Sequence, residues 1–260
     1  MLKLQNVIIT YPGTAAERAA HHQYEVNDGS PPAKTKAIDS IDLTVNDGEN
    51  IALIGENGAG KTTLLLAIAG ILELSDGVIE VDGIRLEKKT VNEIRKRAGL
   101  VFQNPDDQLF MPLVYDDIAF GCRNSGLPED MVKTRVDETL NQLHISHLRN
   151  RSPLRLSGGE KRMAAVATVL AMEPSLLMFD EPTAFLDPKG KRAVIETLNK
   201  LRHTKIVATH DLAFAAEVCS RVIILQNGRI AADGMPELLY DKELMLNCGL
   251  EAIDKKPPNN

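Results

Sequence analysis

The sequence predicts an α/β domain built around a mostly parallel central sheet. Short apolar runs near residues 51, 98, 176, 206 and 222 are typical of buried strands, and segments with helical patterning separate them. This alternation favours parallel strands joined by helical crossovers. A glycine-rich turn follows the first run, and two acidic residues end the third. Both lie at the carboxyl ends of strands, where sheets of this kind bind ligands.

Two further groups of elements surround this sheet. Residues 2–10, 38–45 and 78–81 are predicted to form strands of an antiparallel flank, while residues 104–170 are predicted to be mostly helical. Because Gly and Pro interrupt the helical stretch, we expect separate helices over 116–123 and 129–143 and after Ser157. We expect one domain over residues 1–250, with 104–170 as a helical arm and 251–260 as a disordered tail.

Residues 55–62, Gly-Glu-Asn-Gly-Ala-Gly-Lys-Thr, form a complete phosphate-binding loop between an apolar strand and an apolar helix. Its glycines let several backbone N–H groups point at one phosphate, and the helix N-terminus favours the anion. Lys61 would reach the β- and γ-phosphates, and Thr62 would offer its hydroxyl to Mg²⁺. The residues expected to contact the nucleotide are Gly55, Glu56, Asn57, Gly58, Ala59, Gly60, Lys61, Thr62 and Thr63.

The apolar run over residues 176–179 ends in Asp180 and Glu181. An aspartate at the carboxyl end of a buried strand can place its carboxylate on a phosphate-bound Mg²⁺. Glu181 follows directly and could accept a proton from an attacking water. Taken alone, the pair also fits a strand that ends in two solvated acids. The phosphate loop upstream favours the catalytic interpretation.

The stretch Leu156-Ser157-Gly158-Gly159-Glu160 precedes a helical run. Its Ser-x-x-Glu pattern predicts a capping box, which builds a helix start with positive potential. The two glycines leave that helix start open to a phosphate, and capping alone does not require them. We therefore predict both a structural and a ligand-binding role for this stretch.

In this order, the three motifs resemble the nucleotide-binding domain of ATP-binding cassette (ABC) transporters over about residues 1–250. Within that class the chain looks most like the energy-coupling-factor ATPases of cobalt, nickel and vitamin uptake. That closer resemblance rests on residues 101–110, on Glu160 where most cassettes carry Gln, and on the ending at 237–251. It implies a P-loop NTPase fold, ATP hydrolysis, and ATP and Mg²⁺ as cofactors.

The resemblance also implies roles for residues outside the three motifs. Gln103 would contact Mg²⁺ or the lytic water, His210 would contact the γ-phosphate, and Asp187 would cross a dimer interface. By their local sequence alone, Gln103 is a strand-end residue and His210 a polar residue at a helix entry. The implied catalytic set is Glu181, His210, Gln103 and Lys61, and the implied Mg²⁺ ligands are Thr62, Gln103 and Asp180.

Tyr11 ends the first apolar strand and matches the aromatic residue that stacks on adenine in the family. The residues alone allow a second reading, in which Tyr11 only packs on the core. Residues 13–36 carry about twenty more residues than cassettes of this type usually have there, and we expect a surface loop. Tyr24 within this insertion is the alternative adenine contact.

Composition narrows the class of protein further. The chain has 260 residues and a net charge of −6, which argues against a general nucleic-acid binder. Cys122, Cys219 and Cys248 show no zinc spacing and no even disulfide set, which suits a reducing cytoplasm. No run of 18 apolar residues is present, so we expect any channel to belong to another polypeptide.

The resemblance implies a peripheral subunit at the cytoplasmic face of the cell membrane that powers uptake of a small nutrient, with cobalt or nickel ion as the first candidate. Its partners would be a second, identical or related ABC ATPase subunit, a polytopic membrane protein and a substrate-binding membrane subunit. Each ATP would lie between the phosphate loop of one cassette and Ser157, Gly158, Gly159, Glu160 and Asp187 of the other. The alternatives are a vitamin transporter, another ABC importer or exporter, a soluble non-transport ABC ATPase, and a catalytically silent nucleotide sensor.

Overall fold

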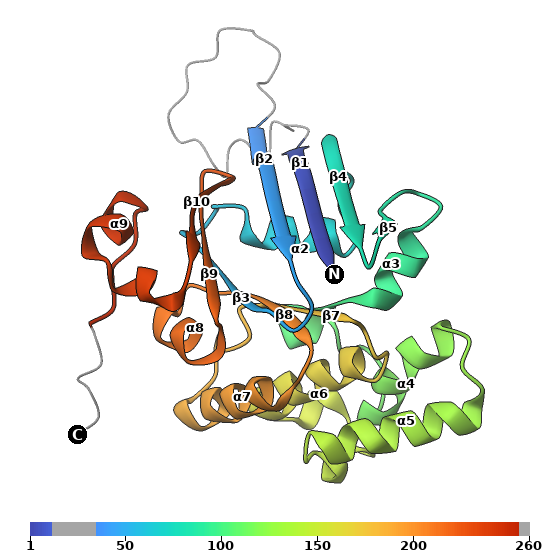
Figure 1. Ribbon diagram of the computed structural model, residues 1–260. Helices are drawn as coiled ribbons and strands as arrows, with labels where there is room; N and C mark the ends of the chain where they lie inside the picture. The colour runs from blue at the N-terminus through green and yellow to red at the C-terminus, as the bar shows by residue number, and fades with distance from the viewer. Residues whose placement is uncertain (12–34, 255–260) are drawn as a thin grey trace, which may run out of the picture.

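The computed structural model describes residues 1–11 and 35–254, and Figure 1 shows its arrangement. The central sheet has the strand order β10-β9-β3-β8-β7-β6. All its strands except β10 run parallel, as the sequence predicts, and β10 pairs antiparallel with β9. The strands are β3 (Asn50–Ile54), β6 (Ala98–Val101), β7 (Leu176–Asp180), β8 (Thr204–Ala208), β9 (Arg221–Gln226) and β10 (Arg229–Gly234).

A second, antiparallel sheet covers one side of the first and confirms the predicted flank. Its strand order is β2-β1-β4-β5, and β1 pairs antiparallel with both β2 and β4. The strands are β1 (Leu2–Tyr11), β2 (Thr35–Val45), β4 (Asp76–Val81) and β5 (Ile84–Arg85).

The side chains of β3 explain why the central sheet lies between two apolar layers. Ile51 and Leu53 join the core shared with the antiparallel sheet and α2, whereas Ala52 and Ile54 join the core shared with the helical arm. Successive residues of a strand point to opposite faces, so a strand covered on both faces is apolar throughout. The helices beside the first core are α2 (Lys61–Ile68) and α3 (Val91–Arg97).

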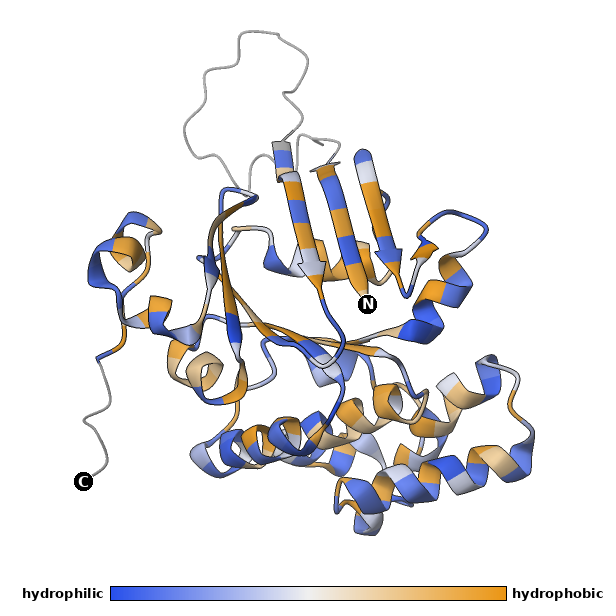
Figure 2. Ribbon diagram, in the orientation of Figure 1, coloured by the Kyte–Doolittle hydropathy of each residue, from blue (hydrophilic) through white to orange (hydrophobic). Residues whose placement is uncertain are grey.

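The opposite side of the central sheet carries the helices of residues 114–218, with their apolar faces turned inward, and the last helix lies beyond β10 (Figures 1 and 2). The helices predicted at 116–123 and 129–143 are present with ends shifted by at most two residues, and the third begins directly after Ser157. The helices are α4 (Val114–Asn124), α5 (Glu129–Gln142), α6 (Gly158–Leu170), α7 (Pro188–Lys200), α8 (Leu212–Val218) and α9 (Lys242–Asn247).

The structure differs from two expected boundaries. Strand β2 begins at Thr35, because its backbone pairs with Tyr11 of β1, so the expected loop over 13–36 extends too far by two residues. The expected tail begins at residue 251, but Ala252 and Ile253 pack on the core and the Ile253 N–H donates to the Leu239 carbonyl (3.1 Å). The rest of that loop, including Tyr24, and residues 255–260 lie outside the described residues.

Candidate functional site

The phosphate loop follows β3 and leads directly into α2. Gly60 has φ +105°, and a Cβ there would lie 2.6 Å from the Ala37 carbonyl, so only glycine fits this turn. The Lys61 ammonium folds back over the loop and donates to the carbonyls of Gly55 (2.7 Å) and Glu56 (3.1 Å). Burial lowers the pKa of Lys61, and the nearby Glu181 and Asp180 charges oppose that shift. A buried cation held by two carbonyls is ready to exchange them for phosphate oxygens.

Thr62 and Asp180 meet where β3 and β7 end. The Thr62 hydroxyl donates to Asp180 Oδ2 at 2.8 Å. The other oxygen, Asp180 Oδ1, is buried and has no hydrogen-bond partner within the described residues. Burial is the main cause that raises the pKa of Asp180. Because buried polar atoms are normally paired, the free oxygen marks a place where a cation fits.

Glu181 follows Asp180 in a strained conformation, with φ +45° for a residue that is not glycine. Its carboxylate is held at both oxygens: the Thr209 hydroxyl donates to Oε2 at 3.0 Å, and His210 Nδ1 lies 2.9 Å from Oε1. Thr209 and His210 directly follow β8, the neighbour of β7, so the sheet itself brings these three residues together. The Glu181 side chain is 10% exposed, whereas the His210 side chain is 68% exposed. The buried carboxylate therefore has a fixed orientation beside an open face.

Tyr11 lies at the edge of this cluster. Its hydroxyl is 3.1 Å from Thr63 Oγ1 on α2, which places the ring beside the helix that starts at the phosphate loop. Tyr11 is 40% exposed, so part of the residue remains open to a ligand.

The predicted capping box at Ser157 is present. The Glu160 N–H donates to the Ser157 hydroxyl (3.4 Å), and Glu160 Oε2 accepts from the Ser157 N–H (2.9 Å). Within the described residues no hydrogen bond or ion pair joins Ser157–Glu160 to the phosphate loop. Ser157–Glu160 lies instead beside the segment that leads into α7, because a Cβ on Gly158 would be 3.9 Å from Leu186. Asp187 in that segment caps α7 by accepting from the Gly190 N–H (2.7 Å).

Gln103 lies just after β6. Its backbone carbonyl accepts from Arg162 at 2.5 Å, and its side chain makes no hydrogen bond within the described residues. Arg162 and Thr209 are the two residues of this region that sequence reasoning missed. The position of Thr209 directly before His210 at a strand end was a usable signal, whereas a single arginine in a helix gives none.

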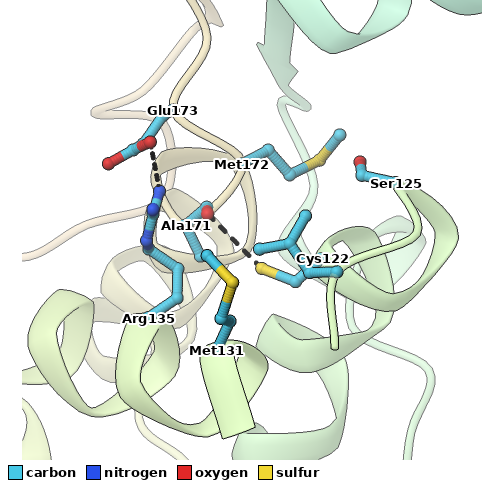
Figure 3. Close-up of a pocket in the computed structure, with 8 residues that line it drawn as sticks. Cys122, Ser125, Met131, Arg135, Ala171, Met172 and Glu173 are labelled. Carbon is cyan, nitrogen blue, oxygen red and sulfur yellow. Dashed lines mark hydrogen bonds and ion pairs between the residues drawn. The ribbon is translucent and has the colours of Figure 1, made fainter. Parts of the chain in front are cut away.

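A separate cavity of about 230 Å³ lies between α4, α5 and the end of α6 (Figure 3). The Cys122 thiol donates to the Ala171 carbonyl at 3.3 Å, and burial raises the pKa of this thiol. No residue predicted for the nucleotide site lines this cavity, and its protonated thiol is a packing group.

Similar sequences and structures identify the family of this chain. The profile of the family "ABC transporter" matches residues 38–184. The chain belongs to the ABC transporter family. It is 42% identical over 233 residues to the energy-coupling factor transporter ATP-binding protein of Methanothermobacter thermautotrophicus, a match that covers 87% of this chain and 73% of that protein.

Two solved ABC structures have the same fold. The first is cbiO1 from Clostridium perfringens, described as part of the ABC transporter complex cbiONQ, with a TM-score of 0.76, 36% identity and coverage of 95% of this chain and 93% of that chain. The second is a cassette dimer in a post-hydrolysis state bound to ADP and Pi, with a TM-score of 0.74, 25% identity and coverage of 91% and 99%.

This ABC protein is therefore an ATP-hydrolysing subunit of a transporter, which confirms the predicted fold and reaction class. ABC ATPases of this kind bind ATP, dimerise and pair with membrane components. Within residues 1–11 and 35–254, no helix is long and apolar enough to cross a membrane.

Proposed function

We propose that Glu181 is the general base for ATP hydrolysis in this ABC ATPase. This proposal rests on the contacts of Thr209 and His210 with the two carboxylate oxygens of Glu181. A carboxylate fixed in this way can accept a proton from a water that attacks the γ-phosphate. His210, which is exposed and touches Glu181, would reach the γ-phosphate from the same side. Lys61 would leave its two carbonyls and bind the β- and γ-phosphates.

The residues around Asp180 fit Mg²⁺. Thr62 and Asp180 supply a hydroxyl and a carboxylate, which are the oxygen ligands Mg²⁺ prefers, and Asp180 Oδ1 is buried without a partner. Gln103 would add an amide oxygen from the end of β6. When bound, Mg²⁺ neutralises charge on the phosphate oxygens. Tyr11 would stack on adenine, and the main chain of residues 55–63 would cradle the phosphates.

The second half of each nucleotide site would come from another ABC ATPase subunit. Gly158 and Gly159 support this proposal, because neither has positive φ and a Cβ on either would meet only ordinary contacts, at 3.9 and 3.7 Å. The protomer itself does not need glycine at these positions. An open helix start is what a γ-phosphate bound to a second subunit needs. Asp187, beside these glycines, would cross the same interface.

The transported substrate is proposed from the energy-coupling-factor resemblance. We expect uptake of cobalt or nickel ion, with a vitamin as the alternative. The chain would lie at the cytoplasmic face of the membrane, with a polytopic membrane protein and a small substrate-binding membrane subunit as partners. Support comes from the 42% identity to an energy-coupling factor ATPase and from the likeness to cbiO1.

A pull-down of the tagged chain from gently solubilised membranes, followed by mass spectrometry, tests the partners. Recovery of a polytopic protein and a small membrane subunit is the expected result, and recovery of soluble partners alone contradicts the proposal. Cobalt and nickel accumulation in cells that carry either the wild-type chain or Glu181→Gln tests the substrate. Equal accumulation in the two strains, together with recovery of a vitamin-binding subunit, would show that the transported substrate is a vitamin and not the metal ion.

A further inference from the structure

Lys191 places a cation at the start of a helix, where the helix dipole disfavours positive charge. It lies in the first turn of α7, and that turn contains no acidic residue. Because the N-terminal end of a helix carries positive potential, a lysine there weakens the helix. The ammonium instead contacts another element, because it forms an ion pair with the Asp211 carboxylate at the start of α8. This contact gives a physical reason for a lysine at an otherwise unfavourable position.

Asp211 is held at both of its carboxylate oxygens. Oδ2 accepts from the Lys191 ammonium, and Oδ1 accepts from the Phe214 N–H (3.0 Å) as the N-cap of α8. Burial raises the pKa of Asp211, but the Lys191 ammonium and the Phe214 N–H outweigh burial, so that this pKa lies below 3.8. Asp211 is therefore ionised at neutral pH, and its carboxylate ties the start of α8 to α7.

The backbone of Asp211 sets the direction of the Thr209 hydroxyl. The Asp211 N–H donates to Thr209 Oγ1 (3.1 Å), and the same hydroxyl donates to Glu181 Oε2 (3.0 Å). Thr209 is fully buried, and a hydroxyl has a single proton to donate. Because the N–H of Asp211 occupies a lone pair of this oxygen, the hydroxyl proton is left for the carboxylate. An unbroken series of contacts thus joins Lys191 to Glu181.

We propose that Lys191 is a positioning residue for the general base, because it holds Asp211 where its N–H directs the Thr209 hydroxyl at Glu181. Without the ammonium, the Asp211 carboxylate keeps only its bond to the Phe214 N–H, and the segment before α8 gains freedom to turn. The Glu181 carboxylate then loses its fixed orientation, which slows proton transfer from water without weakening ATP binding. This inference rests on the proposed role of Glu181.

ATP turnover by the full chain, with the partners that co-purify with it, tests the role of Lys191. Lys191→Met should lower kcat per folded molecule by about 3- to 10-fold, the range for loss of a typical hydrogen bond, and leave KM for ATP unchanged. Lys191→Arg keeps a cation and should recover most of the rate. Thr209→Val removes the hydroxyl but keeps the shape of the side chain, and in that background Lys191→Met should cause no further loss.

Arg192→Met is the matched control. Arg192 is the next residue of α7 and also pairs with α8, through Glu217 (2.7 Å), but Glu217 lies near the other end of that helix. The variant therefore removes an ion pair between the same two helices without disturbing Asp211. It should keep the wild-type kcat, whereas a loss equal to that of Lys191→Met would show that the general packing of α7 on α8 matters and would overturn the proposal.

Two further results would also overturn the proposal. One is a wild-type kcat in Lys191→Met, and the other is a pair of losses in Lys191→Met and Thr209→Val that multiply in the double variant. A near-normal rate in Glu181→Gln instead overturns the general base, and the inference with it. Should Lys191→Met not fold, Asp211→Asn decides. Asparagine still caps α8 but carries no charge for the ammonium, so kcat must fall by a similar factor.

Discussion

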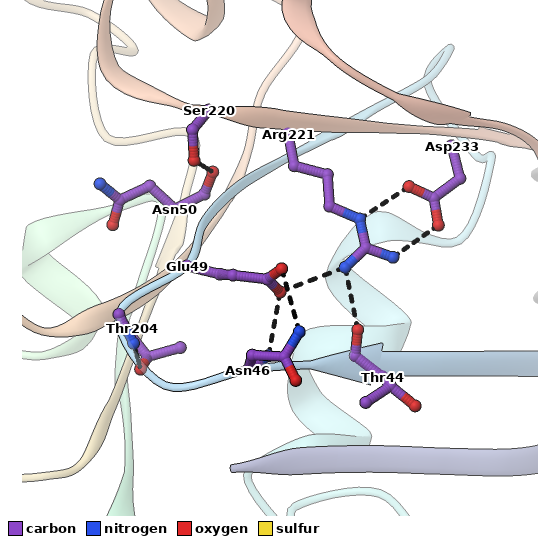
Figure 4. A network of polar contacts seen from close by, with 9 residues as sticks. Thr44, Asn46, Glu49, Asn50, Thr204, Ser220, Arg221 and Asp233 are labelled. Carbon is purple, nitrogen blue, oxygen red and sulfur yellow. Dashed lines mark hydrogen bonds and ion pairs between the residues drawn. The ribbon is translucent and has the colours of Figure 1, made fainter.

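In the central sheet, the edge where the parallel strands begin and the edge where they end are built in opposite ways. At the edge where the parallel strands begin, the side chains around Arg221 form a network of hydrogen bonds (Figure 4). Arg221 donates to both Asp233 oxygens (2.7 Å each), to Glu49 Oε2 (3.1 Å) and to the Thr44 carbonyl (3.0 Å). This network joins β9, β10 and the turn from β2 to β3. In Figure 4 only the Asn50 side chain carries a buried oxygen without a partner.

The carboxyl edge, where the parallel strands end, keeps unfavourable features. Asp180 Oδ1 is buried and unpaired, Glu181 has φ +45°, and the Lys61 ammonium is buried against carbonyls. Each feature costs stability in the protein without nucleotide, and each suits a group that must bind phosphate, Mg²⁺ or a reacting water. The Arg221 network therefore stabilises the fold, whereas the carboxyl edge gives up stability at the residues that we propose for catalysis.

The largest expected effect comes from Glu181→Gln at the carboxyl edge. The amide keeps the shape of the side chain but cannot accept the proton from water, so ATP hydrolysis should fall by about 10²–10⁴-fold while ATP still binds. Phosphate release and nucleotide binding measure the two effects separately. Glu49→Gln at the opposite edge is the control and should keep the wild-type rate per folded molecule. A near-normal rate in Glu181→Gln would show that Glu181 is not the base.

The opposite edge should respond in stability and not in rate. Arg221→Ala removes four hydrogen bonds around a partly buried guanidinium, so the free energy of unfolding should fall by about 1–3 kcal/mol in urea denaturation. ATP turnover of the folded fraction should be unchanged. Arg229→Ala removes an exposed pair with Asp39 and should have a smaller effect. A large loss of turnover in Arg221→Ala would contradict this account, because the Arg221 network would then affect the rate as well as stability.

A smaller effect is expected where the C-terminal segment touches the phosphate loop. Gly249 has φ +75°, and a Cβ there would lie 2.4 Å from Glu56 Oε1. Gly249→Ala should cost about 1 kcal/mol in backbone strain and should also displace Glu56, which raises KM for ATP. Gly48→Ala isolates the strain, because Gly48 has φ +77° and open space around it. Equal KM values in the two variants would show that the contact with Glu56 does not affect the site.

Local sequence was enough to predict the phosphate loop, the strand ending at Asp180 and the capping box at Ser157, because each depends on neighbouring residues. The hydrogen bond from Thr209 to Glu181 could not be predicted from the residues alone, because it joins positions 28 residues apart through the pairing of β7 with β8. The same holds for Arg162, whose partners lie about 60 residues away. These long-range contacts determine how the proposed catalytic groups are oriented.

Strand β10 was missed although the sequence contained a signal for it. Asn227-Gly228 joins β9 to β10, and both residues have positive φ (+50° and +74°), as the tight turns of β-hairpins require. The strand itself alternates partly buried with exposed residues and lies at the edge of the sheet, so it lacks the apolar run that identified its neighbours. The turn was a better guide here than hydrophobicity.

The most direct test of the contrast between the edges is urea unfolding of Asp180→Asn without nucleotide or Mg²⁺. Burial raises the pKa of Asp180 above 3.8, so the ionised carboxylate opposes folding. The contribution of Asp180 to stability is therefore most favourable at low pH, where the carboxyl is protonated, and it is lost as pH rises through the folded-state pKa. At pH 7 the variant should therefore be more stable than wild type, by about 1 kcal/mol, although it no longer hydrolyses ATP. A variant less stable than wild type would contradict the account, because Asp180 would then stabilise the fold.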